Sequence, residues 1–214
     1  MLLNPLQKDA LTELVNVYVG YAASLLSEMV GLRILLSVPR VELIPEAEME
    51  QGDLPLPEIF SPGHIVSSYI SFGQDFRGKA FLVFPVQQAK LLVNACIGEE
   101  LLLEEGDAVP PRFLDTDFDV LKEISNLILN AVIGEFGNLL ETRVVFTVPE
   151  VELIDVTESD QRLFLKDGVY ILILHTTFTV AEIEVQGVIM IALNLNSVSC
   201  LLNKIDTLLE EQDV

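Results

Sequence analysis

Three polar residues recur at one spacing in two distant parts of the chain. Each set has an acid, a second acid four positions later and an asparagine three positions after that: Asp9, Glu13 and Asn16, then Asp119, Glu123 and Asn126. On a helix, this spacing puts the three side chains of a set on one face. A carboxylate there can pair with a cation, and a carboxamide can donate and accept hydrogen bonds at once. A polar strip is also the usual solvent side of a helix, so the spacing alone leaves both interpretations open.

The two strips belong to a longer internal repeat. Residues 9–44 and 119–154 align without a gap at an offset of 110 positions. In both copies a proline, Pro39 or Pro149, follows the asparagine after the same 22 intervening residues. The polar positions recur although most apolar positions of the two segments have been replaced. Surface positions are free to diverge after a duplication, so their retention indicates a constraint beyond packing.

Periodicity predicts the elements that position these residues. Each copy has a helical pattern, three segments rich in Val, Ile and Leu, and a closing helical pattern. The predicted helices are 7–30, 86–97, 116–140 and 196–210, and the predicted strands are 33–44, 65–72, 76–84, 143–154, 169–179 and 182–193. Short turns between neighbouring strands favour hairpins, so we expect an α+β fold with a mostly antiparallel sheet. Since three strands alone would leave an open edge, we expect the copies to share one sheet with pseudo-two-fold symmetry.

The whole chain, 1–214, is predicted to be one domain. Repeat unit one covers 7–97, an acidic linker covers 98–115, and repeat unit two covers 116–210. A second acidic and proline-rich segment, 45–63, is expected to be an exposed excursion from unit one.

The composition excludes several classes of function. The 214 residues include 12 Lys+Arg against 33 Asp+Glu, a formal net charge of −21, and half of them are apolar. Such a chain folds, but it repels phosphate backbones and anionic lipid, so we expect neither nucleic-acid binding nor membrane insertion. Cys96 and Cys200 form no disulfide or metal motif, and no apolar run reaches the roughly 18 residues of a membrane helix. We therefore expect a cytoplasmic protein.

The pattern Asp-x3-Glu-x2-Asn-x22-Pro resembles the signature of the CheC/CheX/FliY family, phosphatases that act on the phosphorylated response regulator CheY. Both copies match it, over 9–44 and 119–154. Two intact sites in a chain of this length resemble the CheC-type members. The resemblance implies a hydrolase of a regulator's phosphoaspartate in chemotaxis or another two-component pathway.

The resemblance also implies a role for each repeated residue. The proposed water-positioning groups are Asn16 and Asn126. The carboxylates expected to pair with the regulator's active-site lysine are Glu13 and Glu123. Supporting roles fall to Asp9, Asp119, Pro39 and Pro149. No cofactor or metal is expected on this chain, because the Mg²⁺ belongs to the regulator's own acidic pocket.

The expected partner is a phosphorylated CheY-like response regulator, and CheD is a second candidate. Two alternatives stay open at this point. One is a non-catalytic docking protein that binds CheD or a regulator, and the other is a duplicated scaffold with inert polar strips.

Two residues depart from the family's pattern. Tyr18 stands where the family commonly has glycine, but it is two positions beyond Asn16 and points away from the strip. Asn130 takes the place of Gly20, one turn beyond Asn126 on the functional face, so we expect two competent but unequal sites. The lone imidazoles His64 and His175 are interpreted as structural.

Overall fold

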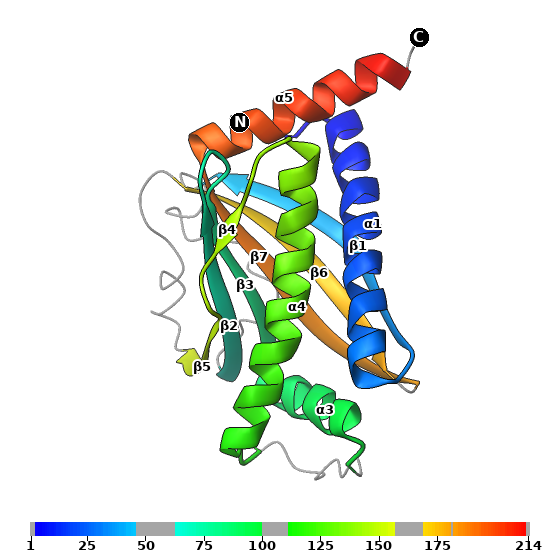
Figure 1. The fold of residues 1–214 in the computed structure, drawn as a ribbon, viewed down its shortest axis with the longest axis vertical. Helices are drawn as coiled ribbons and strands as arrows, with labels where there is room; N and C mark the ends of the chain where they lie inside the picture. The colour runs from blue at the N-terminus through cyan, green and yellow to red at the C-terminus, as the bar shows by residue number, and fades with distance from the viewer. Residues whose placement is uncertain (1–2, 46–62, 100–110, 157–168, 181, 213–214) are drawn as a thin grey trace.

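In the part of the chain that the computed structural model describes, residues 3–45, 63–99, 111–156, 169–180 and 182–212, seven strands form one antiparallel sheet with helices over one face (Figure 1). In chain order the elements are α1 (Pro5–Val30), β1 (Ile34–Pro45), β2 (Gly63–Gly73), β3 (Gly78–Pro85), α3 (Val86–Ile97), α4 (Asp115–Leu139), β4 (Val145–Phe146), β5 (Glu150–Val156), β6 (Val169–Val180), β7 (Ile183–Asn194) and α5 (Leu195–Gln212). The predicted α+β fold with a shared antiparallel sheet is confirmed. Most of the predicted acidic linker and of the 45–63 excursion lies outside the described residues.

The two repeat units exchange strands within the sheet. The strand order is β1-β6-β7-β3-β2-β4, and β5 also pairs with β2. The third strands of the two units, β3 and β7, pair at the centre. On one side of them the first strand of unit one, β1, pairs with the second strand of unit two, β6; on the other, β5 pairs with β2. Neither unit therefore has a complete sheet of its own, which is why the two form one body.

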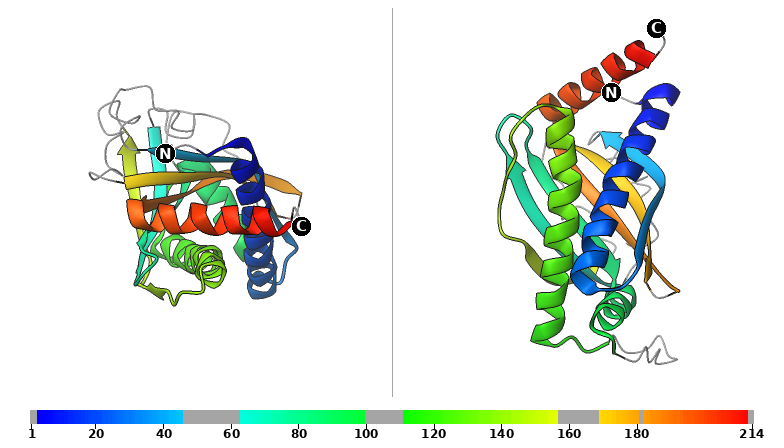
Figure 2. Two further views of the ribbon diagram at one scale, coloured as in Figure 1. Left: turned by 90° about the horizontal axis from the view of Figure 1, so that it is seen from above. Right: turned by 45° about the vertical axis from the view of Figure 1, so that its right-hand side comes forward.

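The first helices of the two units lie side by side over the sheet and run in opposite directions (Figures 1 and 2). They meet through the rings of Tyr18 and Phe136, packed edge to face with centroids 5.3 Å apart. The inward positions of both helices, including Leu11 and Ile128, are fully buried. Helices α5 and α3 close opposite ends of this layer (Figure 1). Among the described helices, none is long and apolar enough to cross a membrane.

Polar side chains fix where the two long helices begin. The Gln7 backbone N–H donates to Asn4 Oδ1 at 2.9 Å, while Gln7 Oε1 accepts from the Asn4 N–H at 3.0 Å, a capping box. In α4 the buried carboxylate of Asp117 accepts from the Leu114 N–H and from Lys90 Nζ, both at 2.8 Å. Asp117, at the third position of α4, therefore caps the first turn of the helix. Its bond to Lys90 also attaches α4 to α3.

The first strands of the two units differ in a way that the sequence did not indicate. Strand β1 is continuous, with a register shift between Ser37 and Arg40 that accommodates the proline between them. The segment predicted as one strand over 143–154 is instead interrupted at 147–149, between β4 and β5. There the Thr147 N–H donates to the Ser71 carbonyl, and the Thr147 hydroxyl oxygen accepts from the Ser71 N–H, both at 2.9 Å. These bonds to β2 replace a continuous strand in unit two.

The central strands are buried on both faces. Side chains that face the helices join one large core, and alternate residues form a second buried cluster on the opposite face. That cluster comprises Ile44, Ile65, Phe81, Val83, Ile171, Ile173, Val188 and Met190. Burial on both faces accounts for the nearly continuous apolar runs in β3 and β7, where alternation was weak.

The close approach of β3 to β7 depends on a glycine. A Cβ at Gly78 would clash with the backbone carbonyl oxygen of Ala192 and lie 2.8 Å from the Phe72 ring. We expect Gly78→Ala to lower the free energy of unfolding by about 1–3 kcal/mol, because backbone on the central strand pair cannot yield. The matched change Gly20→Ala, on an open face of α1, should raise it by about 0.5–1 kcal/mol. Urea unfolding of both variants measures this, and a harmless Gly78→Ala would contradict the packing described.

Candidate functional site

Both polar strips lie on the outer surface of the α1/α4 layer. Asp9, Glu13 and Asn16 are exposed on α1, and Asp119 and Glu123 are exposed on α4. Asn126 is half-buried. Each carboxylate–carboxamide pair is thus one helical turn apart and reachable by a protein that docks on this surface.

Asn16 is bound to the backbone of β1. Its Oδ1 accepts from the Val38 N–H at 3.1 Å, and its Nδ2 donates to the carbonyls of Thr12 at 2.9 Å and Val38 at 3.4 Å. Val38 is only 1% exposed, so water cannot replace these bonds at low cost. The bonds hold β1 directly before Pro39, at the register shift. In unit one, the sequence spacing between Asn16 and Pro39 therefore has a structural cause, since Asn16 must reach the backbone of the residue before Pro39.

Asn126 has a different partner. Its Oδ1 accepts from Asn130 Nδ2 at 2.8 Å. The residue equivalent to Val38 in the repeat, Val148, is 82% exposed and lies in the interruption between β4 and β5. Within the described ranges Asn126 makes no hydrogen bond to that segment. The same asparagine of the motif is therefore bonded to the sheet as well as to its own helix in unit one, and to its own helix alone in unit two.

Asn126 lines a groove between the two long helices, α1 and α4. The groove has a volume of about 510 Å³; Tyr21, Leu25 and Met29 of α1 form its apolar wall. The α4 wall is mixed and consists of Glu123, Asn126, Leu127, Asn130, Ala131, Gly134, Glu135 and Asn138. A partner that enters the groove thus meets an apolar surface on the α1 side and amides and carboxylates among smaller apolar groups on the α4 side.

The sequence did not predict the α1 wall. Helical spacing places Leu25 and Met29 on the apolar side of α1, but Met29 is 47% exposed. Their spacing of four residues is equally typical of a core stripe, so only the packing of α1 against α4 assigns them to a groove.

Tyr18 does not take part in the strip, as its angular position predicted. Its side chain is buried against Phe136. Burial, with a smaller contribution from the negative charge of Glu135, raises the pKa of Tyr18 to about 12. The phenol therefore stays neutral and acts as a packing group.

The supporting residues have the following places. Asp9 and Asp119 make no hydrogen bond or ion pair within the described residues. Pro39 lies in β1 at the register shift, and Pro149 is half-buried between β4 and β5. The roles that the sequence assigned to these four residues stay predictions.

The two histidines lie on the sheet, away from the helix groove. His175 Nε2 is 3.1 Å from Glu42 Oε1, on the sheet face opposite the helices. His64 Nε2 is 3.9 Å from Asp155 on the neighbouring strand β5. In the described part of the chain, no group of three or more His, Cys, Asp or Glu side chains is arranged to hold a metal ion.

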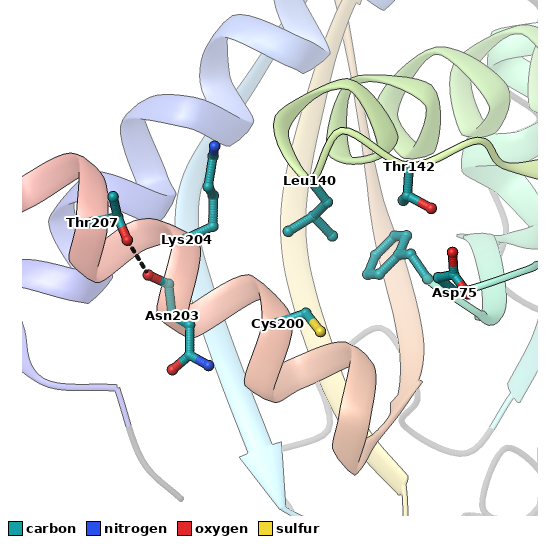
Figure 3. Close-up of a pocket in the computed structure, with 8 residues that line it drawn as sticks. Asp75, Leu140, Thr142, Cys200, Asn203, Lys204 and Thr207 are labelled. Atoms are coloured by element: carbon teal, nitrogen blue, oxygen red, sulfur yellow. Dashed lines mark hydrogen bonds between the residues drawn. The ribbon is translucent and has the colours of Figure 1, made fainter.

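A second cavity, of about 380 Å³, lies under α5 (Figure 3). Phe76 and Leu140 line it together with Cys200, Asn203 and Lys204 of α5. Lys204 Nζ pairs with Glu141 at 2.9 Å, and this cation lowers the pKa of the Glu141 carboxyl. None of the six strip residues lines this cavity, so it is separate from the candidate site.

Two curated proteins that are named as phosphatases are similar to the chain in sequence. No family model matches the chain. The flagellar motor switch phosphatase FliY of Bacillus subtilis is 22% identical over 157 residues, which are 73% of this chain and 38% of that protein. The CheY-P phosphatase CheC of the same organism is 23% identical over 163 residues, 69% of this chain and 66% of that protein. The chain thus spans about a third to two thirds of the length of these curated relatives.

Solved structures share the fold. The crystal structure of Thermotoga maritima FliY has a TM-score of 0.73 at 16% identity, covering 97% of this chain and 99% of that one. The FliM middle domain from H. pylori has a TM-score of 0.60 at 12% identity and covers 94% and 99%. CheX from Desulfovibrio desulfuricans reaches 0.50 at 15% identity over 85% and 99%. FliM is not named as a phosphatase, so the fold by itself does not specify the reaction.

The different anchoring of the two asparagines predicts different effects on stability. Asn16→Ala should lower the free energy of unfolding by about 1–3 kcal/mol, because it leaves the buried Val38 N–H without a partner. Asn126→Ala should lower it by less than about 1 kcal/mol, since it removes one bond between side chains at a groove. Urea denaturation of the two variants tests this, and equal losses would show that Asn16 does not hold β1.

Proposed function

We propose that the chain is a member of the CheC/CheX/FliY family and that it hydrolyses the phosphoaspartate of a CheY-like response regulator. The observation that carries the proposal is the pair Glu123 and Asn126, one turn apart at a groove that an incoming protein can reach. The equivalent pair on α1, Glu13 and Asn16, is the second candidate site. The two curated relatives, named as phosphatases, support the same reaction class.

The reaction needs positioning and little covalent help. A water molecule attacks the phosphorus in line with the leaving carboxylate oxygen. As the new P–O bond forms, the bond to the aspartyl oxygen breaks and its electron pair returns to the carboxylate. The products are aspartate and inorganic phosphate, which carries the oxygen of the water.

The carboxamide is suited to this task because it is uncharged. Its oxygen accepts a hydrogen bond from the water, and its NH₂ donates to a phosphoryl oxygen. A carboxylate in the same place would repel the phosphoryl group. The glutamate one turn earlier pairs with a lysine of the regulator and aligns the amide. Mg²⁺ belongs to the regulator in this scheme, and this chain supplies no metal ligand.

The docking alternative has its own support. Solved structures that share this fold include FliM in complexes with FliG and with SpeE, so the fold serves as a binding module in other proteins. Under this alternative, the chain binds a regulator or CheD without accelerating hydrolysis.

Under either proposal, the net charge of −21 disfavours long-range attraction to a regulator's acidic pocket. Recognition must therefore be short-range.

Phosphate release distinguishes these proposals. Each response regulator encoded in the source genome is phosphorylated with acetyl phosphate, and its dephosphorylation is followed with and without this protein. We expect acceleration by the wild type and at least about a 10²-fold loss in the double variant Asn16→Ala/Asn126→Ala. Asn203→Ala, an exposed asparagine on α5, is the matched control and should keep full activity.

The other outcomes separate the alternatives. Binding of a phosphorylated regulator without acceleration would support the docking protein. A double variant as active as the wild type would disprove the assignment of the asparagines. Absence of any regulator binding would favour an inert scaffold.

A further inference from the structure

We propose that the two units have divided their roles: the Asn126 site performs the reaction, Asn130 is its positioning residue, and Asn16 is a structural anchor. This inference rests on the proposed function and departs from the expectation of two competent sites. The observations that carry it are the hydrogen-bond partners of the two asparagines.

Asn16 is not free to act on a substrate. Both of its amide atoms already bind backbone groups, and the Val38 N–H that it satisfies is buried. If Asn16 turned toward a phosphoryl group, that N–H would lose its only acceptor among the described residues. The cost is about 1–3 kcal/mol, which reduces the competent population roughly 5- to 150-fold.

The Asn126 side chain makes no hydrogen bond to a buried backbone group among the described residues. Its one described partner is the side chain of Asn130, one turn further along α4. Asn130 Nδ2 donates to Asn126 Oδ1, while the Asn126 NH₂ has no hydrogen-bond partner among the described residues at the groove that Asn126 lines. The amide is therefore held by a neighbouring side chain and keeps free capacity at both ends. Its oxygen has a second lone pair for the water, and its NH₂ can donate to a phosphoryl oxygen.

The sequence of α1 prevents the same arrangement in unit one. The position equivalent to Asn130 is Gly20, which has no side chain to hold an amide. A Cβ at Gly20 would have no heavy atom within 4 Å, so packing does not demand the glycine. The asparagine of unit one is thus held by the backbone of β1 and of its own helix, and that of unit two by the Asn130 side chain.

Asn130 has an unsatisfied hydrogen-bond acceptor next to Asn126. Its Oδ1 is buried and has no hydrogen-bond partner among the described residues, although an unsatisfied acceptor is costly. A donor from the docked regulator, or a water molecule that enters with it, would satisfy this oxygen. Docking and alignment of Asn126 would then be coupled through one side chain.

Kinetics of phosphate release test the division of roles. We expect Asn126→Ala to lose at least about 50-fold in kcat, while Asn16→Ala, assayed well below its unfolding temperature, stays within about 2-fold of wild type. Asn130→Ala and the size-matched Asn130→Leu should lower kcat about 5- to 20-fold and leave KM nearly unchanged, because they misalign the amide without removing the docking surface. Asn203→Ala is the control, since Asn203 is an exposed asparagine on α5 that does not line the groove, and it should keep kcat.

A structural readout accompanies the kinetics. In ¹⁵N NMR spectra, Asn130→Ala should shift the side-chain NH₂ signals of Asn126 and leave those of Asn16 in place. Equal halves of the activity in Asn16→Ala and Asn126→Ala, or full kcat in both Asn130 variants, would overturn this inference and leave the proposed function intact. A wild type that accelerates no regulator would overturn both.

Discussion

The exchange of strands between the two repeat units is the constraint on which the rest of the structure depends. Because β1 pairs with β6 and β5 pairs with β2, the helices that precede β1 and β5 are carried over the same face of one sheet. They must then pack against each other, and Tyr18 and Phe136 fill the contact. Two separate half-sheets would bring no such pair of helices together. The groove between α1 and α4 is thus a consequence of strand order.

The same exchange explains how two nearly identical motifs acquired different surroundings. In unit one, β1 runs unbroken along β6 and brings the buried Val38 backbone within reach of Asn16. In unit two, the chain is drawn toward β2 through Thr147, and the equivalent backbone leaves the helix. One sequence pattern therefore supports a tie to the sheet in one place and a free amide in the other. Divergence after duplication has acted on the supports more than on the motif.

This chain shares its fold with FliY, FliM and CheX, and its candidate site lies on the surface of the two helices α1 and α4. FliY and the FliM middle domain share this fold at 16% and 12% identity. A shared fold does not specify a reaction, so function must be argued from the side chains of this chain. In this chain the groove between α1 and α4 presents carboxylates, amides and an apolar α1 wall, above a sheet that is buried on both faces.

The sequence by itself determined the repeat, the position of every long helix, the hairpins and the polar strips, because these follow from local periodicity and short-range spacing. It also indicated the family, through the motif and its proline. It did not reveal the interruption at 147–149, since Pro39 and Pro149 look equivalent in the alignment and only pairing with β2 separates them. It did not assign Met29 to a groove or Asn16 to the Val38 backbone. Those facts belong to the tertiary structure, because they depend on contacts between segments whose relative placement is decided by strand exchange and not by any residue's neighbours in the chain.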